Sequence, residues 1–154
     1  MLELEVYLNN VENGFIVSTE SNDFIWEAKL SPAFSDDQDP QFDIQLRIKR
    51  KDGGQVLDFG NIDQGQVLIR EGHLSFELLK DVSLDINGKT ESPVFHHYER
   101  NYGLKPSVDL MFRFKHLNPE QTVELNYRDE LFGQGLIKLE FSKELFNKCH
   151  VEKT

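Results

Sequence analysis

The sequence predicts an all-β protein: an antiparallel β-sandwich or open barrel of about eight to eleven strands with a short C-terminal helix. Three observations lead to this fold class. Four stretches alternate between apolar and polar residues, turn signals recur about every ten residues, and no long helical pattern separates the strands. Because successive side chains of a strand point to opposite faces, each alternating stretch predicts a sheet with one buried and one solvated face.

The alternating stretches carry apolar residues at every second position. These residues are Leu2, Leu4, Val6 and Leu8; Phe42, Ile44, Leu46 and Ile48; Val82, Leu84 and Ile86; and Val108, Leu110, Phe112 and Phe114. Further segments are rich in β-branched or aromatic residues and are also expected to be strands. They are residues 14–19, 24–30, 66–70, 73–79, 93–98, 122–127 and 136–141.

Glycine and asparagine mark the turns between these segments. Hairpin turns are expected at residues 12–14 (Glu-Asn-Gly), 51–54 (Lys-Asp-Gly-Gly) and 87–88 (Asn-Gly). Both residue types tolerate the positive φ that tight turns between antiparallel strands require. The spacing of these turns favours an antiparallel arrangement over parallel βαβ units.

Residues 119–132 allow two interpretations. Pro119 could begin a helix that runs to Gly133, with Val123 and Tyr127 on one face. The alternative places Val123, Leu125 and Tyr127 on one face of a strand. We prefer the strand, because the Thr-Val pair at 122–123 is a weak helix former and the neighbouring segments are already β.

The C-terminal helix is expected to begin after Ser142, whose side chain can cap residues 143–149. Leu145 and Phe146 would then face the core, and the tail from Val151 would fray. Cys149 in this helix is interpreted as a small packing residue.

A single domain over residues 1–154 accounts for the length and composition. The chain has 154 residues, 38% of them hydrophobic and 29% charged, which lies far from the composition of disordered chains. No repeat, low-complexity run or linker interrupts it.

Several features of the sequence suggest a cytoplasmic protein. Cys149 is the only cysteine, so neither an intrachain disulfide nor a multi-cysteine zinc site can form. The first residues are acidic and alternating, whereas a secretory signal would be basic and then continuously apolar. No stretch approaches the roughly 20 apolar residues that span a bilayer.

The formal net charge of −10 argues against binding to nucleic acid or an anionic membrane, both of which require clustered Lys and Arg. The surplus also promotes solubility. It is concentrated in residues 20–43, which contain seven carboxylates and one lysine. Two basic regions follow, the first with Arg47, Lys49, Arg50 and Lys51, and the second with Arg100, Lys105, Arg113 and Lys115.

The acidic segment is the predicted partner-binding site. Phe34 would supply desolvated contact, while Asp36, Asp37 and Asp39 would attract a positively charged protein. The expected function is therefore non-enzymatic protein binding, either as a neutralising, immunity-type protein or as an adaptor or structural module. Edge strands near residues 2–8 could also pair between copies.

Two other functions are compatible with the sequence. The aspartates of residues 35–40 have the oxygen density that calcium prefers, although EF-hand spacing is lacking, and a concave sheet face could bind a carbohydrate. An enzyme could use His96 or His97 with Glu99, and this alternative requires a pocket around those side chains. His96 and His97 should point to opposite faces of their strand. No motif fixes a reaction, a metal site or a cofactor.

Overall fold

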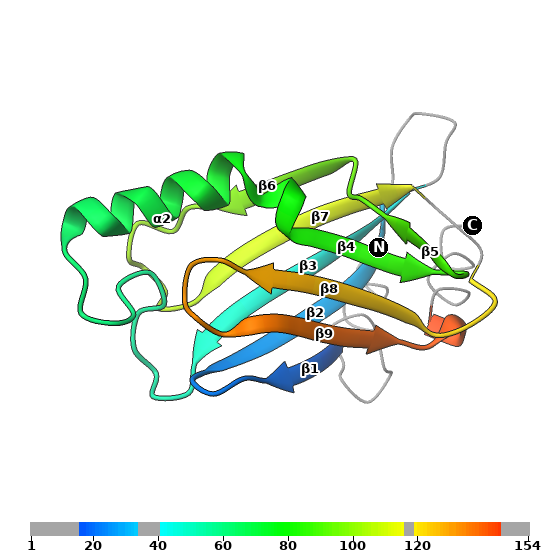
Figure 1. The fold of residues 1–154 in the computed structure, drawn as a ribbon, viewed down its shortest axis with the longest axis horizontal. Helices are drawn as coiled ribbons and strands as arrows, with labels where there is room; N and C mark the ends of the chain where they lie inside the picture. Colours follow the sequence, from blue (N-terminus) through cyan, green and yellow to red (C-terminus); the bar gives the residue numbers. More distant parts are fainter. Residues whose placement is uncertain (1–15, 34–40, 116–118, 146–154) are drawn as a thin grey trace.

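The structure is a computed structural model that describes residues 16–33, 41–115 and 119–145. Two antiparallel sheets make up most of it (Figure 1), so the predicted antiparallel sandwich is confirmed. The five-stranded sheet has the order β1-β2-β3-β7-β6. Its strands are β1 (Ile16–Glu20), β2 (Phe24–Ala33), β3 (Gln41–Arg50), β7 (Val108–Lys115) and β6 (Phe95–Glu99).

The four-stranded sheet faces the first one across the core and has the order β5-β4-β8-β9. Its strands are β5 (Lys89–Glu91), β4 (Val82–Ile86), β8 (Val123–Asp129) and β9 (Gly135–Phe141). The strand interpretation of residues 122–127 is thus correct, because β8 pairs with both β4 and β9. No described helix is long and apolar enough to cross a membrane.

Register places the alternating apolar residues together in the core. In β3 and β7, Ile44 lies opposite Phe112 and Leu46 opposite Leu110, and all four are buried. Burial of such side chains contributes roughly 1.5–3 kcal/mol each. Their polar neighbours in sequence consequently share the outer, solvated face of the five-stranded sheet.

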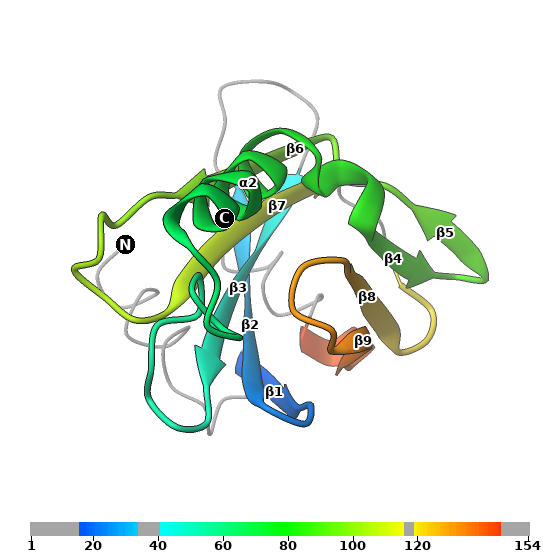
Figure 2. The same cartoon turned by 60° about the vertical axis from the view of Figure 1, so that its left-hand side comes forward.

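The two open sides of the sandwich are closed differently. On one side β1 lies next to β9. On the other side, helix α2 (Gln64–Phe76) and the 3₁₀-helix η2 (Leu78–Asp81) bridge β6 and β4 (Figure 2). Arg70 holds α2 to the preceding connection by donating to the carbonyls of Leu57 and Phe59, both at 2.8 Å.

Helix α2 corrects the sequence prediction, because the strands expected at residues 66–70 and 73–79 do not form. Asp63 instead begins a helix with a capping box, in which its carboxylate accepts from the backbone N–H of Gln66 at 2.8 Å. Leu74 of α2 and Leu78 of η2 are fully buried. Tertiary packing and capping therefore override the β-propensity of the apolar run at residues 67–69.

The predicted turns have different outcomes. Asn87 and Gly88 form the β4–β5 hairpin turn with φ of 53° and 76°, as expected. Residues 51–54 do turn after β3, but they lead toward α2 and not into a paired strand, so the hairpin expected there is wrong. The turn expected at 12–14 and the strand expected at 2–8 lie outside the described residues.

The C-terminal helix begins where the sequence predicts. Residues 143–145 are helical, and Ser142 Oγ accepts from the backbone N–H of Leu145 at 3.4 Å. Leu145 is buried, in agreement with its expected inward position. Phe146, Cys149 and the tail lie beyond the described residues.

Candidate functional site

The predicted partner-binding residues belong to a segment outside the described residues. Phe34, Asp36, Asp37 and Asp39 lie between the last residue of β2, Ala33, and the first residue of β3, Gln41. The structure does describe the charged residues of both neighbouring strands.

Arg47 and Lys49 of the first basic region lie on the outer face of the five-stranded sheet and are paired there with carboxylates. Arg47 and Asp109 are opposite each other in β3 and β7 and form two hydrogen bonds, Nε to Oδ1 at 2.7 Å and Nη2 to Oδ2 at 3.3 Å. Lys105 Nζ donates to the same carboxylate at 3.1 Å. Lys49 forms an ion pair with Glu27 of β2. Each of these three cations therefore has a carboxylate partner within the chain, with Asp109 shared between Arg47 and Lys105.

These contacts also shift the ionisation of the groups involved. The hydrogen bond to Asp109 raises the pKa of Arg47. Burial alone would raise the pKa of Asp109, but the hydrogen bonds from Arg47 and Lys105 lower it to below its ordinary value. Asp109 thus stays ionised at neutral pH.

The second basic region is paired in the same way. Arg113 of β7 donates from Nε and Nη2 to the two carboxylate oxygens of Asp43, at 2.8 and 3.1 Å. Arg100 lies 4.0 Å from Glu71 of α2. Glu27 and Asp43, two of the seven carboxylates in residues 20–43, therefore pair with cations of the basic regions.

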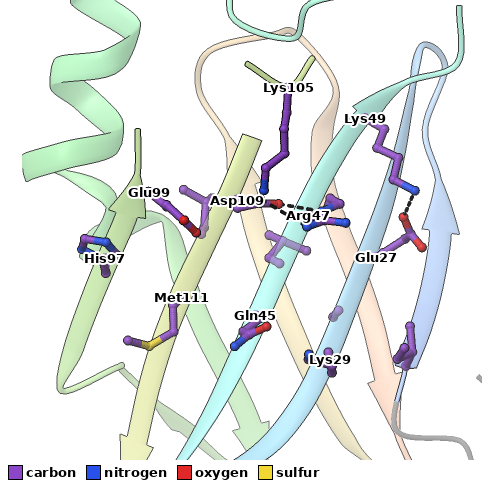
Figure 3. Close-up of a pocket in the computed structure, with 14 residues that line it drawn as sticks. Glu27, Lys29, Gln45, Arg47, Lys49, His97, Glu99, Lys105, Asp109 and Met111 are labelled. Carbon is purple, nitrogen blue, oxygen red and sulfur yellow. Dashed lines mark hydrogen bonds and ion pairs between the residues drawn. The ribbon is translucent and has the colours of Figure 1, made fainter. Parts of the chain in front are cut away.

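A hollow of about 470 Å³ opens on the same outer face (Figure 3). Polar and charged side chains from four strands and from the β6–β7 loop line most of it. The lining comprises Ile16, Glu27, Ala28, Lys29, Gln45, Leu46, Arg47, Lys49, His97, Glu99, Lys105, Asp109, Leu110 and Met111. Its formal charge is close to zero, because four lysines and arginines face three carboxylates.

The two histidines point to opposite faces, as the sequence predicts. His97 lines the hollow together with Glu99, whereas His96 lies on the inner side and contacts the backbone carbonyl of Ser75 at 3.1 Å through Nε2. In the part of the chain that the structure describes, no hydrogen bond joins His97 to Glu99. Since alternate residues of a strand are about 7 Å apart, the pair is not a preassembled acid–base dyad.

The β6–β7 loop carries the most exposed apolar side chains of the described residues. Tyr102 and Leu104, in the β6–β7 loop, are each 87% exposed. The loop is internally bonded: Asn101 accepts at 3.0 Å from the N–H of Gly103 and donates at 3.0 Å to the carbonyl of Ser107. Tyr102 has a φ of 54°, so the turn holds it in the left-handed region. Exposed rings on fixed backbone are typical anchors of protein interfaces.

A row of carboxylates crosses the outer face of the four-stranded sheet. Asp85 lies opposite Glu124, and Glu124 lies opposite Glu140. Like charges at directly opposed positions destabilise a sheet, and Lys138, 3.7 Å from Glu124, offsets only part of this cost. In the described residues, no group of three or more His, Cys, Asp or Glu side chains could hold a metal ion. The row is an acidic surface.

Sequence reasoning found the charged residues of the outer face but not their arrangement. The hollow depends on the strand order β2-β3-β7-β6, which joins segments far apart in the chain. Local alternation reveals that Glu27, Arg47 and Asp109 face solvent, but not that they are neighbours. Tyr102 carried a usable signal, because it lies beside a glycine in a basic turn.

Comparisons with known proteins give no relative to reason from: no family model matches the chain, and no match was found among curated proteins or solved structures.

Proposed function

We propose that the protein is a non-enzymatic binding module that engages a positively charged protein, in a neutralising, immunity-type role or as an adaptor. The observation that carries the proposal is the internal pairing of the basic regions. The arginines of both regions lie within ion-pair distance of carboxylates of the chain. These arginines therefore add little net positive charge to the surface. The net charge of −10 comes from the other residues of the chain and can act on a partner.

The contact site in this proposal remains the segment with Phe34, Asp36, Asp37 and Asp39. Arg47 and Lys49 of β3, one of the two strands that border it, have Asp109 and Glu27 as partners, and Arg113 of the neighbouring β7 has Asp43. The carboxylates of the segment would accelerate encounter with a basic protein, and Phe34 would contribute contact area. A cytoplasmic location belongs to the same proposal.

The test compares two triple variants of equal charge change. The first is Asp36→Asn, Asp37→Asn, Asp39→Asn; the control is Glu120→Gln, Glu130→Gln, Glu144→Gln, at exposed positions outside residues 20–43. The binding partner is first captured from the source cell, identified and purified, and association rates are then measured at low salt. We expect the first variant to associate about tenfold more slowly than the control, because attraction between opposite charges raises association rates.

Equal association rates for the two variants would refute the role of the segment. An acidic captured partner would refute the proposal as a whole, since two negatively charged proteins repel each other during encounter.

The hollow supports a second function, the binding of a small polar ligand such as a carbohydrate. Its wall of Gln45, Arg47, Lys49 and Glu99 offers both donors and acceptors over about 470 Å³, within the usual volume of ligand sites. Calorimetric titration with monosaccharides, with Glu99→Gln as the comparison, tests it. Heat of binding that is reduced in Glu99→Gln supports the ligand site, whereas no heat at millimolar sugar counts against it.

A further inference from the structure

Helix α2 lies at one side of the sandwich (Figure 2), and three of its large apolar side chains are exposed. Leu68, Ile69 and Phe76 are 57%, 71% and 82% exposed. Successive helical residues are about 100° apart, so these three side chains share an arc of about 100° with Gly65 and Gly72. Large apolar side chains therefore alternate with glycines along one exposed helix face.

Nothing in the part of the chain that the structure describes requires a glycine at position 72. Its φ lies outside the positive range, and a Cβ added there would meet no atom within 4 Å. A glycine in a helix interior costs about 1 kcal/mol relative to alanine. Close approach of another molecule would explain the missing side chain, because glycine lets a second backbone or a large side chain come near.

The spacing on α2 is complementary to itself. The midpoint between Arg70 and Glu71 is equally distant from Ile69 and Gly72, and also equally distant from Gly65 and Phe76. If two copies of α2 cross antiparallel at this midpoint, Ile69 of each copy faces Gly72 of the other, and Phe76 faces Gly65. A two-fold axis generates both contacts twice, as in an isologous interface.

Charge permits the same arrangement. Glu77, at the C-terminal end of α2, already pairs with His73 at 3.2 Å and with Lys80 at 3.6 Å in its own chain. The face itself carries no carboxylate, so two copies of net charge −10 can approach along it with little local repulsion.

We propose that two copies of this chain associate through the outer face of α2, with Ile69 and Phe76 of one copy seated over Gly72 and Gly65 of the other. The three large side chains offer roughly 400 Å² per copy, less than the roughly 800 Å² per partner of a standard stable interface. The dimer is therefore weak and reversible, with a dissociation constant on the order of 100 µM. This proposal is independent of the binding function above.

Sedimentation velocity of the full chain between about 1 and 300 µM tests the proposal. We expect a monomer at the lowest concentration and a growing dimer fraction above it. Gly72→Leu should weaken self-association at least tenfold without lowering the melting temperature, because leucine is a better helix former and a Cβ at this position meets no atom within 4 Å. Leu104→Lys, at an exposed position in the β6–β7 loop, should dimerise like the unmodified chain.

A cross-linking measurement tests the register on a Cys149→Ser background. Protein carrying Ile69→Cys is mixed with protein carrying Gly72→Cys, and we expect a disulfide between the two copies under mild oxidation. A chain that stays monomeric at every concentration would overturn the proposal. So would a dimer that persists unchanged in Gly72→Leu, since that result assigns dimerisation to another surface such as a strand edge.

Discussion

Asp109 organises the charges on the outer face of the five-stranded sheet. Its carboxylate accepts two hydrogen bonds from Arg47 and one from Lys105, and only 17% of its side chain is exposed. A partly buried carboxylate with three charge-assisted hydrogen bonds contributes more to stability than an exposed ion pair. It also offsets part of the positive charge of the two cations that it joins.

Replacement of the Asp109 carboxylate should reveal its contribution to stability. We expect Asp109→Asn to lower the free energy of unfolding by roughly 1–2 kcal/mol at pH 7. The pKa of Asp109 is lower in the folded protein than its ordinary value of 3.8, so its contribution is present above that value and is lost as pH falls through the folded pKa. Urea unfolding at pH 7 and near pH 3 measures the difference.

The control for this prediction is Glu130→Gln, at an exposed carboxylate in the connection between β8 and β9. It should change the free energy of unfolding by less than about 0.5 kcal/mol at either pH. If Asp109→Asn unfolds like this control at pH 7, the carboxylate does not stabilise the sheet.

At the scale of elements, α2 shows what local patterns miss. Val67, Leu68 and Ile69 are three consecutive apolar residues, a composition shared by buried strands and helices. The decisive signal is the pair Asp63 and Gln66, three residues apart, which forms a capping box. The strands were predictable because period-two alternation persists over several residues, whereas the helix depends on its first turn and on burial of Leu74.

The capping box is testable by single substitution. Asp63→Ala should destabilise the protein by about 1 kcal/mol, because it leaves the backbone N–H of Gln66 without its acceptor. Gln64→Ala, one residue further along and exposed, serves as the control and should have almost no effect. Thermal unfolding of the two variants compares them, and equal melting temperatures would contradict the role of the cap.

At the scale of the whole molecule, the sequence predicts the buried faces of the two sheets more completely than the arrangement of side chains on their outer faces. Alternation in β3 and β7 predicts which side chains are buried, and Ile44 and Phe112 do meet in the core. It does not specify which strands become neighbours. The hollow and the ion pair between Arg47 and Asp109 depend on that order, so neither was predictable from residues 62 positions apart.

The charge balance of the molecule also emerges only at this scale. The sequence shows an acidic segment followed by basic ones, which could have neutralised each other. The structure pairs Arg47 with Asp109 and Arg113 with Asp43, while Asp85, Glu124 and Glu140 form an acidic row on the opposite sheet. Negative charge consequently remains on the surface, and we propose that it selects a basic partner.

The most direct measurement is the rate of association with the purified partner as ionic strength rises from about 20 to 500 mM. Our account predicts that the association rate constant falls at least tenfold across this range while the dissociation rate constant changes little, because salt screens long-range attraction more than contacts within the complex. An association rate constant that stays level with salt would contradict the proposal that the acidic surface attracts the partner.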